Sequence, residues 1–187
     1  MKHCIICMIL LAISYGKENN NYVFMETKFG LIKIELYPNK APISVKNFLK
    51  YINENRYKDF YFYRTVNLQN QPNNDIKIEV IQGGLRFDKH PMSLDPIKHE
   101  NTKITGLKHI NGSISMARIE PGSANSEIFI CINNQPELDF GGKRNSDGQG
   151  FATFGKVIHG FEVIKKIHNQ KNEKQILIDP IHVKFIK

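Results

Sequence analysis

Two segments decide the fold of this chain: Phe60-Tyr61-Phe62-Tyr63-Arg64-Thr65-Val66 and Ile78-Glu79-Val80-Ile81-Gln82-Gly83-Gly84. Both are rich in aromatic and β-branched residues, which predicts two strands. The loop between them, residues 67–75, holds four Asn, two Gln and one Pro. Such a segment favours turns and continues neither strand. The sequence therefore predicts two adjacent strands joined by a polar loop.

The polar side chains inside these apolar strands are the first candidates for function. Because side chains alternate along a strand, Arg64 is expected to share a face with Phe62, and Gln82 with Val80. A charged and an amide side chain between apolar neighbours indicate either a functional face or an edge strand whose polar residues face water. The pattern of these two strands alone leaves both interpretations open.

The rest of the chain reads as a mostly β protein. Strands are expected at residues 22–26, 32–36, 113–118, 127–132, 151–157 and 181–185. A helix is expected to open at Pro42, with apolar residues at i, i+3, i+4 and i+7, and a second helix follows Gly160. Residues 85–109 and 135–150 read as long irregular loops. Many short strands without a βαβ rhythm favour a barrel or a sandwich.

Composition narrows the class of function. The chain has 187 residues, a 41% hydrophobic content and a formal net charge of +8, which fits one domain with a sizeable core. Its lysines are scattered rather than gathered in a stripe with stacking aromatics, so nucleic-acid binding is not expected. The histidines are dispersed without metal-ligand spacing, and we expect neither a metal nor another cofactor.

The N-terminus has the pattern of a signal peptide. A short basic start precedes the apolar run from Cys4 to Ile13, and small residues follow it. We expect a signal peptide at residues 1–16, a linker at 17–21 and one domain at 22–187. A retained interfacial anchor is the alternative, but the run is too short to span a membrane, so stable insertion is not expected. Cys4 and Cys7 lie within this run, which leaves Cys131 as a single buried thiol.

Several collinear motifs resemble the cyclophilin-type peptidyl-prolyl cis-trans isomerases over residues 25–186. They are Phe62-Tyr63-Arg64, Val80-Ile81-Gln82-Gly83-Gly84, residues 30–36, Ala41-Pro42 with Asn47-Phe48, residues 112–117, residues 126–130 and residues 154–157. Each motif is weak alone, and their order makes the match specific. The resemblance implies a closed eight-stranded antiparallel barrel capped by two α-helices, with its site on the outer wall.

The resemblance also implies roles for particular residues. Arg64 takes the place of the donor to the prolyl nitrogen, and Gln82 that of the residue that holds the neighbouring carbonyl. The expected substrate-binding positions are Phe62, Val80, Ala117, Arg118, Glu127, Phe129, Leu138 and Phe151. Of these, Ala117 and Arg118 lie where the family presents backbone to an extended peptide. Without the resemblance, Phe129 and Leu138 are better explained as ordinary core residues.

Four positions depart from the best-known members of the family. Glu79 stands where Phe is usual, and Glu127 stands in place of a Gln. Glu137 stands where many eukaryotic members have Trp, and Phe151 fills a His position. These differences predict a more acidic and less aromatic groove. Either Glu79 or Glu127 could pair with Arg64, to orient it or to compete with substrate.

The sequence thus predicts an isomerase that acts on proline-containing unfolded or flexible polypeptides during the folding of exported proteins. The expected location is the periplasm or a secretory lumen, and the expected state is a monomer. The alternative on the same fold is a non-catalytic chaperone or adaptor that binds proline-containing segments. The presence of both Arg64 and Gln82 favours the enzyme.

Overall fold

A computed structural model describes residues 21–86 and 90–186 of the chain. The predicted signal peptide, residues 1–16, and all but the last residue of the predicted linker, 17–21, lie outside the described residues. The strands are β1 (Tyr22–Thr27), β2 (Gly30–Leu36), β3 (Tyr61–Val66), β4 (Val80–Gly84), β5 (Ser113–Met116), β6 (Ile128–Cys131), β7 (Ala152–His159), β8 (Asn172–Glu173), β9 (Ile176–His182) and β10 (Lys184–Ile186). The α-helices are α1 (Pro42–Asn53), α2 (Thr102–Thr105) and α3 (Phe161–His168), and two 3-10 helices are η1 (Arg56–Asp59) and η2 (Pro136–Leu138).

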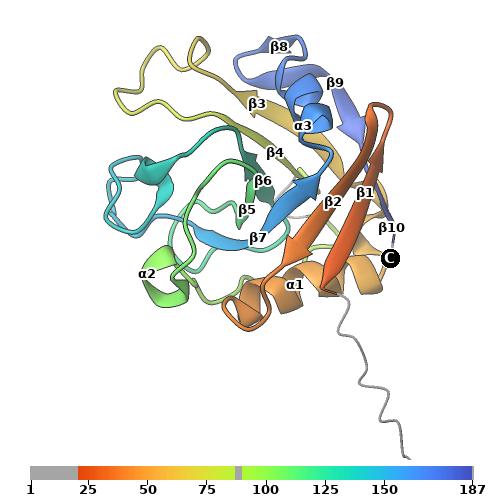
Figure 1. Cartoon of the computed structure of the whole chain (residues 1–187), viewed down its shortest axis with the longest axis horizontal. Coiled ribbons are helices and arrows are strands. Elements are labelled where there is room, and N and C mark those ends of the chain that lie inside the picture. Colours follow the sequence, from red (N-terminus) through yellow and green to blue (C-terminus); the bar gives the residue numbers. More distant parts are fainter. Residues whose placement is uncertain (1–20, 87–89, 187) are drawn as a thin grey trace, which may run out of the picture.

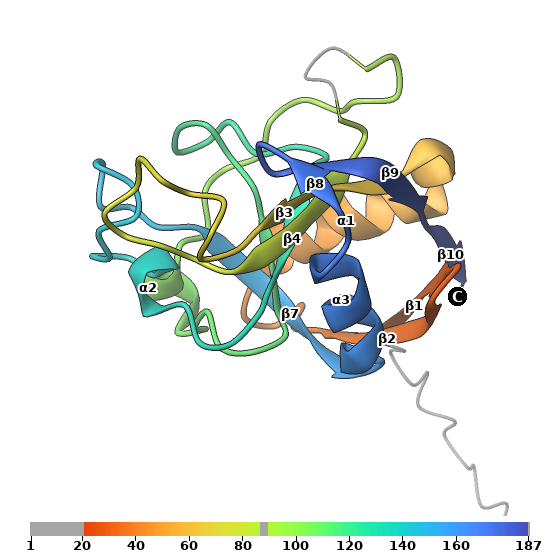
Figure 2. The same ribbon diagram turned by 90° about the horizontal axis from the view of Figure 1, so that it is seen from above.

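The described strands form one antiparallel sheet in the order β10-β1-β2-β7-β5-β6-β4-β3-β9-β8. The sheet curls into a barrel (Figures 1 and 2). Its two sides are joined by the C-terminal segment, in which β9 pairs with β3 and β10 pairs with β1. Only Val183 separates these two strands, and its amide bonds to Phe60 O at 3.0 Å. The mostly β prediction is confirmed, with one correction: the hydrogen-bonded ladder itself is not closed.

Two helices occupy opposite ends of the barrel, with α1 at one end and α3 at the other (Figure 1). The predicted apolar stripe of α1 faces inward, and Val45 and Phe48 are buried. In α3, Val163, Ile164 and Ile167 are buried in the same way. Both predicted helices are confirmed, and the short α2 lies within a segment expected to be irregular.

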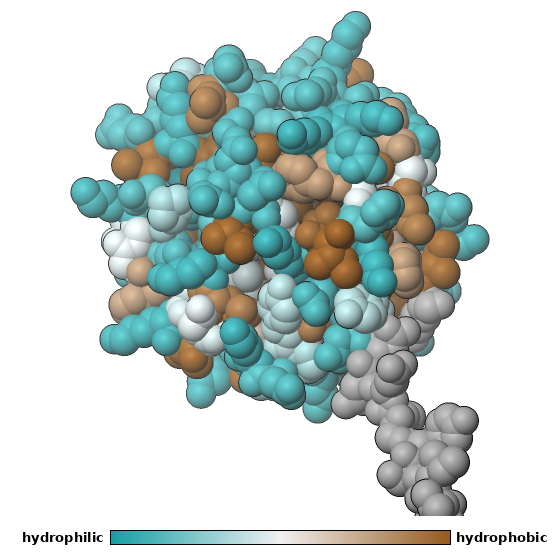
Figure 3. Space-filling model, in the orientation of Figure 1, coloured by the Kyte–Doolittle hydropathy of each residue, from teal (hydrophilic) through white to brown (hydrophobic). Residues whose placement is uncertain are grey.

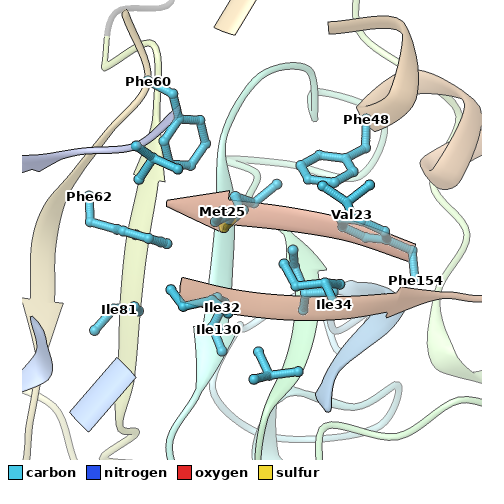
Figure 4. Packing of buried hydrophobic residues seen from close by; sticks show 14 of the residues in the cluster. Val23, Met25, Ile32, Ile34, Phe48, Phe60, Phe62, Ile81, Ile130 and Phe154 are labelled. Carbon is cyan, nitrogen blue, oxygen red and sulfur yellow. The ribbon is translucent and has the colours of Figure 1, made fainter. Parts of the chain in front are cut away.

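The barrel interior is filled with side chains. Figure 4 shows Val23, Met25, Ile32 and Ile34 from β1 and β2 packed with phenylalanines from the opposite side and from α1. The rings of Phe48 and Phe154 lie 5.3 Å apart by centroid. Because the interior is full, a substrate can bind only on the outside of the barrel. On the face shown in Figure 3, hydrophobic residues form separate small patches among hydrophilic ones.

Phe62 is the one predicted site residue that does not lie on the outer wall of the barrel. Its ring is fully buried in the barrel interior, where Figure 4 shows it among the core side chains. The pairing of β3 with both β4 and β9 shifts register between Phe62 and Arg64. Tyr63 is the extra residue of this β-bulge, so the simple alternation of faces fails there. The expectation that Phe62 shares a face with Arg64 is therefore wrong.

Within the described parts of the chain, no helix has the length and hydropathy needed to cross a membrane. The same residues contain no cluster of three or more His, Cys, Asp or Glu side chains suited to hold a metal ion.

Candidate functional site

A groove of about 300 Å³ opens on the outer wall of the barrel, across β3, β4 and β6. Nine of the ten predicted site residues line it, all except Phe62. The complete lining is Tyr63, Arg64, Ile78, Val80, Gln82, Arg86, Ala117, Arg118, Ile119, Ser123, Asn125, Glu127, Phe129, Leu138 and Phe151. The polar side chains that the sequence singled out thus lie beside one apolar cavity rather than along a solvated edge.

The apolar part of the groove is a cluster separate from the barrel core, which we call the outer cluster. It consists of Val66, Ile78, Val80, Phe129, Cys131 and Leu138, with Ala117 and Phe151 packed against it. The rings of Phe129 and Phe151 meet edge to face, with centroids 5.2 Å apart. Because Phe129 and Leu138 are buried and yet border the groove, they serve both as packing residues and as its floor. Burial raises the pKa of the Cys131 thiol, which therefore stays protonated.

A buried His–Asp pair supports this floor from below. The imidazole of His109 stacks on Phe129 with centroids 5.8 Å apart. Its Nδ1 lies 2.8 Å from Asp139 Oδ1, and its Nε2 lies 3.1 Å from the Ser115 hydroxyl. Burial lowers the pKa of His109, and the hydrogen bond to Asp139 opposes that change only in part. Burial alone acts to raise the pKa of Asp139, but the hydrogen bonds from His109 outweigh it, and the pKa is lowered.

Arg64 is held at the rim of the groove by two amide side chains. Its Nη1 donates to Gln82 Oε1 at 2.7 Å. Its Nε and Nη2 both donate to Gln175 Oε1, at 3.0 and 2.5 Å. Burial lowers the pKa of Arg64, and the charge of Tyr63 acts in the opposite direction; the guanidinium nevertheless stays protonated at neutral pH. No sequence pattern pointed to Gln175, which lies 111 residues further along the chain.

Tyr63 is a second residue that sequence reasoning missed, because its place in the β-bulge was not predicted. Its hydroxyl donates to Glu127 Oε2 at 2.6 Å and accepts from Gln82 Nε2 at 2.9 Å. Burial and then the charge of Glu127 raise the pKa of Tyr63. Glu127 also accepts from the backbone amide of Arg86 at 3.0 Å. The pairing with Arg64 that was considered for Glu127 does not occur among the described contacts, because Glu127 binds Tyr63 instead.

The Arg118 side chain fastens a loop to the edge of the groove. It forms a two-point ion pair with Asp147, at 2.7 and 2.9 Å. Its Nε and Nη2 donate to Gly150 O at 2.8 and 2.6 Å. The guanidinium also lies 5.1 Å from the centre of the Phe151 ring. The adjacent Ala117 donates its amide to Glu127 O at 2.8 Å.

Glu79 and Glu137, the other two acidic residues at unusual positions, do not line the groove. Glu79 accepts a hydrogen bond from Asn133 Nδ2 at 3.0 Å, and Ile78 contributes the apolar side chain to the groove instead. Glu137 accepts from the Lys143 amide at 2.8 Å, within its own loop. The expectation of a more acidic groove is therefore wrong for Glu79 and Glu137, and Glu127 is the only acidic residue among those that line it.

The arrangement supplies hydrogen-bond donors beside an apolar cavity. Arg64 has five N–H groups, of which its contacts with Gln82 and Gln175 occupy three. One N–H on each terminal nitrogen remains for a ligand. Gln82 likewise keeps one amide hydrogen after its bond to Tyr63. Such a site can bind an apolar ring and place a fixed cationic donor next to it.

Comparison with known proteins agrees with this geometry. The family model "Cyclophilin type peptidyl-prolyl cis-trans isomerase/CLD" matches residues 22–185. The chain is 39% identical over 173 residues to a peptidyl-prolyl cis-trans isomerase of Acinetobacter baylyi, covering 90% of this chain and 83% of that one. It is 35% identical over 149 residues to peptidyl-prolyl cis-trans isomerase B of Escherichia coli, covering 78% and 82%. A crystal structure of a Cryptosporidium parvum cyclophilin type peptidyl-prolyl cis-trans isomerase, in the presence of the dipeptide Ala-Pro, matches with a TM-score of 0.68 at 26% identity, covering 88% of this chain and 97% of that one. As its sequence motifs predict, the chain belongs to the cyclophilin-type peptidyl-prolyl cis-trans isomerase family.

Proposed function

We propose that this chain catalyses cis–trans isomerisation of X-Pro bonds with Arg64 as the catalytic donor and the outer cluster as the pocket for the proline ring. The observation that carries the proposal is the position of Arg64. Its guanidinium is fixed by Gln82 and Gln175 at the rim of the apolar groove, with N–H groups left over.

The physics of the reaction explains why a fixed donor is sufficient. The partial double bond of the X-Pro amide gives a rotational barrier of about 18–20 kcal/mol. In the planar states the nitrogen lone pair is delocalised into the carbonyl, and in the twisted state it becomes available to accept a hydrogen bond. A donor aimed at this nitrogen therefore binds the transition state better than either ground state. No covalent bond is made or broken, so the reaction needs no nucleophile.

The remaining residues of the groove bind the peptide. Phe129, Leu138 and Val80 contact the proline ring, and Phe151 closes the pocket from the side. Gln82 donates its free amide hydrogen to the substrate carbonyl. Ala117 and Arg118 present backbone to the extended peptide, and Glu127 acts through Tyr63, which it holds against Gln82.

The substrates are proline-containing segments of unfolded or flexible proteins that have left the cytoplasm. This rests on the basic start and apolar run at residues 1–16, which have the order of a signal peptide. The enzyme acts in the periplasm or a secretory lumen and as a monomer, since one chain provides the whole groove. N-terminal sequencing of exported protein tests the first point and sedimentation tests the second. Intact Met1 recovered from membranes would contradict cleavage.

A protease-coupled assay on an X-Pro tetrapeptide tests the activity itself. The wild-type protein is expected to accelerate isomerisation, and Arg64→Ala to lose about 10²–10³ in rate, as is typical when one preorganised donor is removed. Peptide binding measured in parallel separates the enzyme from the non-catalytic chaperone or adaptor. Binding without acceleration in the wild type supports the adaptor, and full activity in a folded Arg64→Ala protein refutes the role of Arg64.

A further inference from the structure

The amide side chain of Gln175 makes the larger share of the contacts that hold the Arg64 guanidinium. Its Oε1 accepts from both Nε and Nη2, whereas Gln82 accepts from Nη1 alone. The main chain of Gln175 takes part as well, because its carbonyl accepts from the Thr65 amide at 2.8 Å. Gln175 thus holds both the side chain of Arg64 and the main chain of the strand that carries it.

The Gln175 amide is itself fixed from behind by the polar loop between β3 and β4. Its Nε2 donates to Asn70 O at 3.0 Å. Asn70 in turn donates from Nδ2 to Thr65 O and to Asn172 Oδ1, at 3.0 Å each. The Gln175 side chain thus has a partner for its NH₂ group, Asn70 O, and a partner for its oxygen, the Arg64 guanidinium. These two contacts fix the oxygen toward Arg64. The Asn-rich loop, which in the sequence only signals a turn, supports the site.

The backbone at Gln175 is in a conformation that glutamine rarely adopts. Lys174 and Gln175 form the two-residue turn between β8 and β9, with φ angles of 47° and 77°. Turns of this kind favour Gly, Asn or Asp at both positions. Other side chains are strained in this region of backbone conformation. The chain keeps a glutamine where a glycine fits the backbone better, and its side chain binds Arg64.

We propose that Gln175 is a positioning residue that sets the orientation of Arg64 for the isomerisation. This inference rests on the proposed function of Arg64 and deepens it. With Gln175 in place, the Arg64 guanidinium is held at Nη1 on one side and at Nε and Nη2 on the other, so its remaining N–H groups point in a fixed direction. Without it, the group is held only at Nη1 and can turn about its last torsions. A misplacement of about 1 Å at a reacting centre can lower a rate by about 10²-fold.

Gln175→Gly is the decisive variant, because glycine removes the side chain and relaxes the turn while keeping the carbonyl that binds Thr65. Its matched control is Lys174→Gly, which relaxes the same turn and removes an exposed side chain. We expect both variants to be at least as stable as the wild type in urea. We expect kcat to fall about 10-fold or more in Gln175→Gly, with KM changed less than 2-fold, and activity to be unchanged in Lys174→Gly. Equal kcat in all three proteins would overturn the proposal.

A double-mutant cycle separates positioning from a general structural effect. In the Arg64→Ala background, Gln175→Gly is expected to cause no further loss of kcat, because the residue it positions is gone. A loss of the same factor in both backgrounds would overturn the proposal. The Arg64 Nε–H resonance in NMR gives a readout independent of activity: its exchange with solvent should accelerate in Gln175→Gly and stay slow in Lys174→Gly. If Arg64→Ala is fully active, the proposed function fails; if only Gln175→Gly is fully active, this inference alone fails.

Discussion

The Tyr63 hydroxyl donates a 2.6 Å hydrogen bond to the Glu127 carboxylate. The same hydroxyl accepts from Gln82 Nε2, and Gln82 Oε1 accepts from Arg64. Glu127 and Arg64 are therefore linked through two intervening side chains rather than by direct contact. The carboxylate fixes the direction of the Tyr63 hydroxyl, and this in turn fixes which end of the Gln82 amide faces Arg64.

Removal of the Tyr63 hydroxyl is expected to break the series of hydrogen bonds that links Glu127 to Arg64. In Tyr63→Phe, the Gln82 amide loses an acceptor and the Glu127 carboxylate loses a donor, so the Gln82 side chain is held by its contact with Arg64 alone. We expect kcat/KM to fall about 10-fold and the free energy of unfolding to fall by about 1–3 kcal/mol, the usual cost of leaving a buried polar partner unsatisfied. The coupled assay and urea unfolding measure the two effects.

Tyr61→Phe is the matched control for Tyr63→Phe, because Tyr61 lies on the same strand and is 37% exposed. Its substitution is expected to change neither activity nor stability appreciably. Wild-type behaviour of Tyr63→Phe in both measurements would show that the Gln82 amide keeps its orientation without the tyrosine.

The sequence predicted the local elements of this fold well where one pattern holds over a whole segment. The apolar alternation of β2 and the helical stripe of α1 each bury one face, and both were correctly predicted. The prediction of side-chain direction failed where a β-bulge interrupts the regular alternation of strand β3. The bulge at Tyr63 depends on pairing with β4 and β9, strands distant in sequence, so the reversal of faces between Phe62 and Arg64 cannot be read from β3 alone.

Some residues of the candidate site can likewise be recognised from the sequence, and others cannot. Arg64 and Gln82 are recognisable because polar side chains stand out within apolar strands. Gln175 is not recognisable, since a glutamine in a polar turn is ordinary until the fold brings it against Arg64. Glu79 misled the prediction because strand β4 begins at Val80, two residues later than the predicted segment, and the neighbouring Ile78 takes the place in the groove.

The buried His109 predicts how stability depends on pH. Because its pKa is lowered in the folded state, the unfolded chain binds the proton first as the pH falls through about 6.5, and stability is lost from there downward. The lowered pKa of Asp139 adds a further loss below about pH 4. We expect the free energy of unfolding to fall between pH 7 and pH 5. In His109→Asn this slope should be smaller, and stability at pH 7 lower by about 1–3 kcal/mol.

Unfolding by urea at several pH values measures both quantities. The exposed His159 on β7 provides the control, and His159→Asn is expected to keep the wild-type slope. Ser115 and Lys108 also face the pair, the first through Nε2 of the imidazole and the second through Asp139. An unchanged slope in His109→Asn would assign the pH dependence to other groups.

Glu100 is expected to stabilise the protein without contributing to the site. The N-cap residue of helix α1 is Ala41, which has no side-chain oxygen to cap the helix. The Glu100 carboxylate takes that role from the long loop, accepting from the amides of Ile43 and Ser44 at 3.1 and 2.7 Å. We expect Glu100→Ala to lower the free energy of unfolding by about 1–2 kcal/mol, the upper range for a lost helix cap.

The control for Glu100→Ala is Glu162→Ala in the first turn of α3, where the described contacts include no side-chain hydrogen bond for this residue. Its effect should remain within about 0.5 kcal/mol. Both variants are expected to keep wild-type kcat/KM. If Glu100→Ala lost activity in proportion to Arg64→Ala, the loop would have to be assigned to the catalytic site.

Arg118 connects the groove to the loop at residues 141–150. Its two-point pairing with Asp147 and its two bonds to Gly150 O use the planar fork of the guanidinium, which a lysine cannot reproduce. The loop leads directly into Phe151, which packs on Phe129. Loosening the loop therefore releases one wall of the groove while Arg64 stays in place.

We expect Arg118→Lys to raise KM about 3- to 10-fold with kcat nearly unchanged, because the loss falls on ground-state binding and transition-state binding alike. Hydrogen exchange of residues 141–150 should accelerate in the same variant, and exchange within β3 and β4 should not. The opposite split, with kcat lowered and KM retained, would place Arg118 in the transition state together with Arg64. Asp147→Asn, which keeps the shape of the partner but removes its charge, should give the same pattern as Arg118→Lys in weaker form. If Asp147→Asn leaves KM and loop exchange unchanged, the bonds to Gly150 O alone hold the loop.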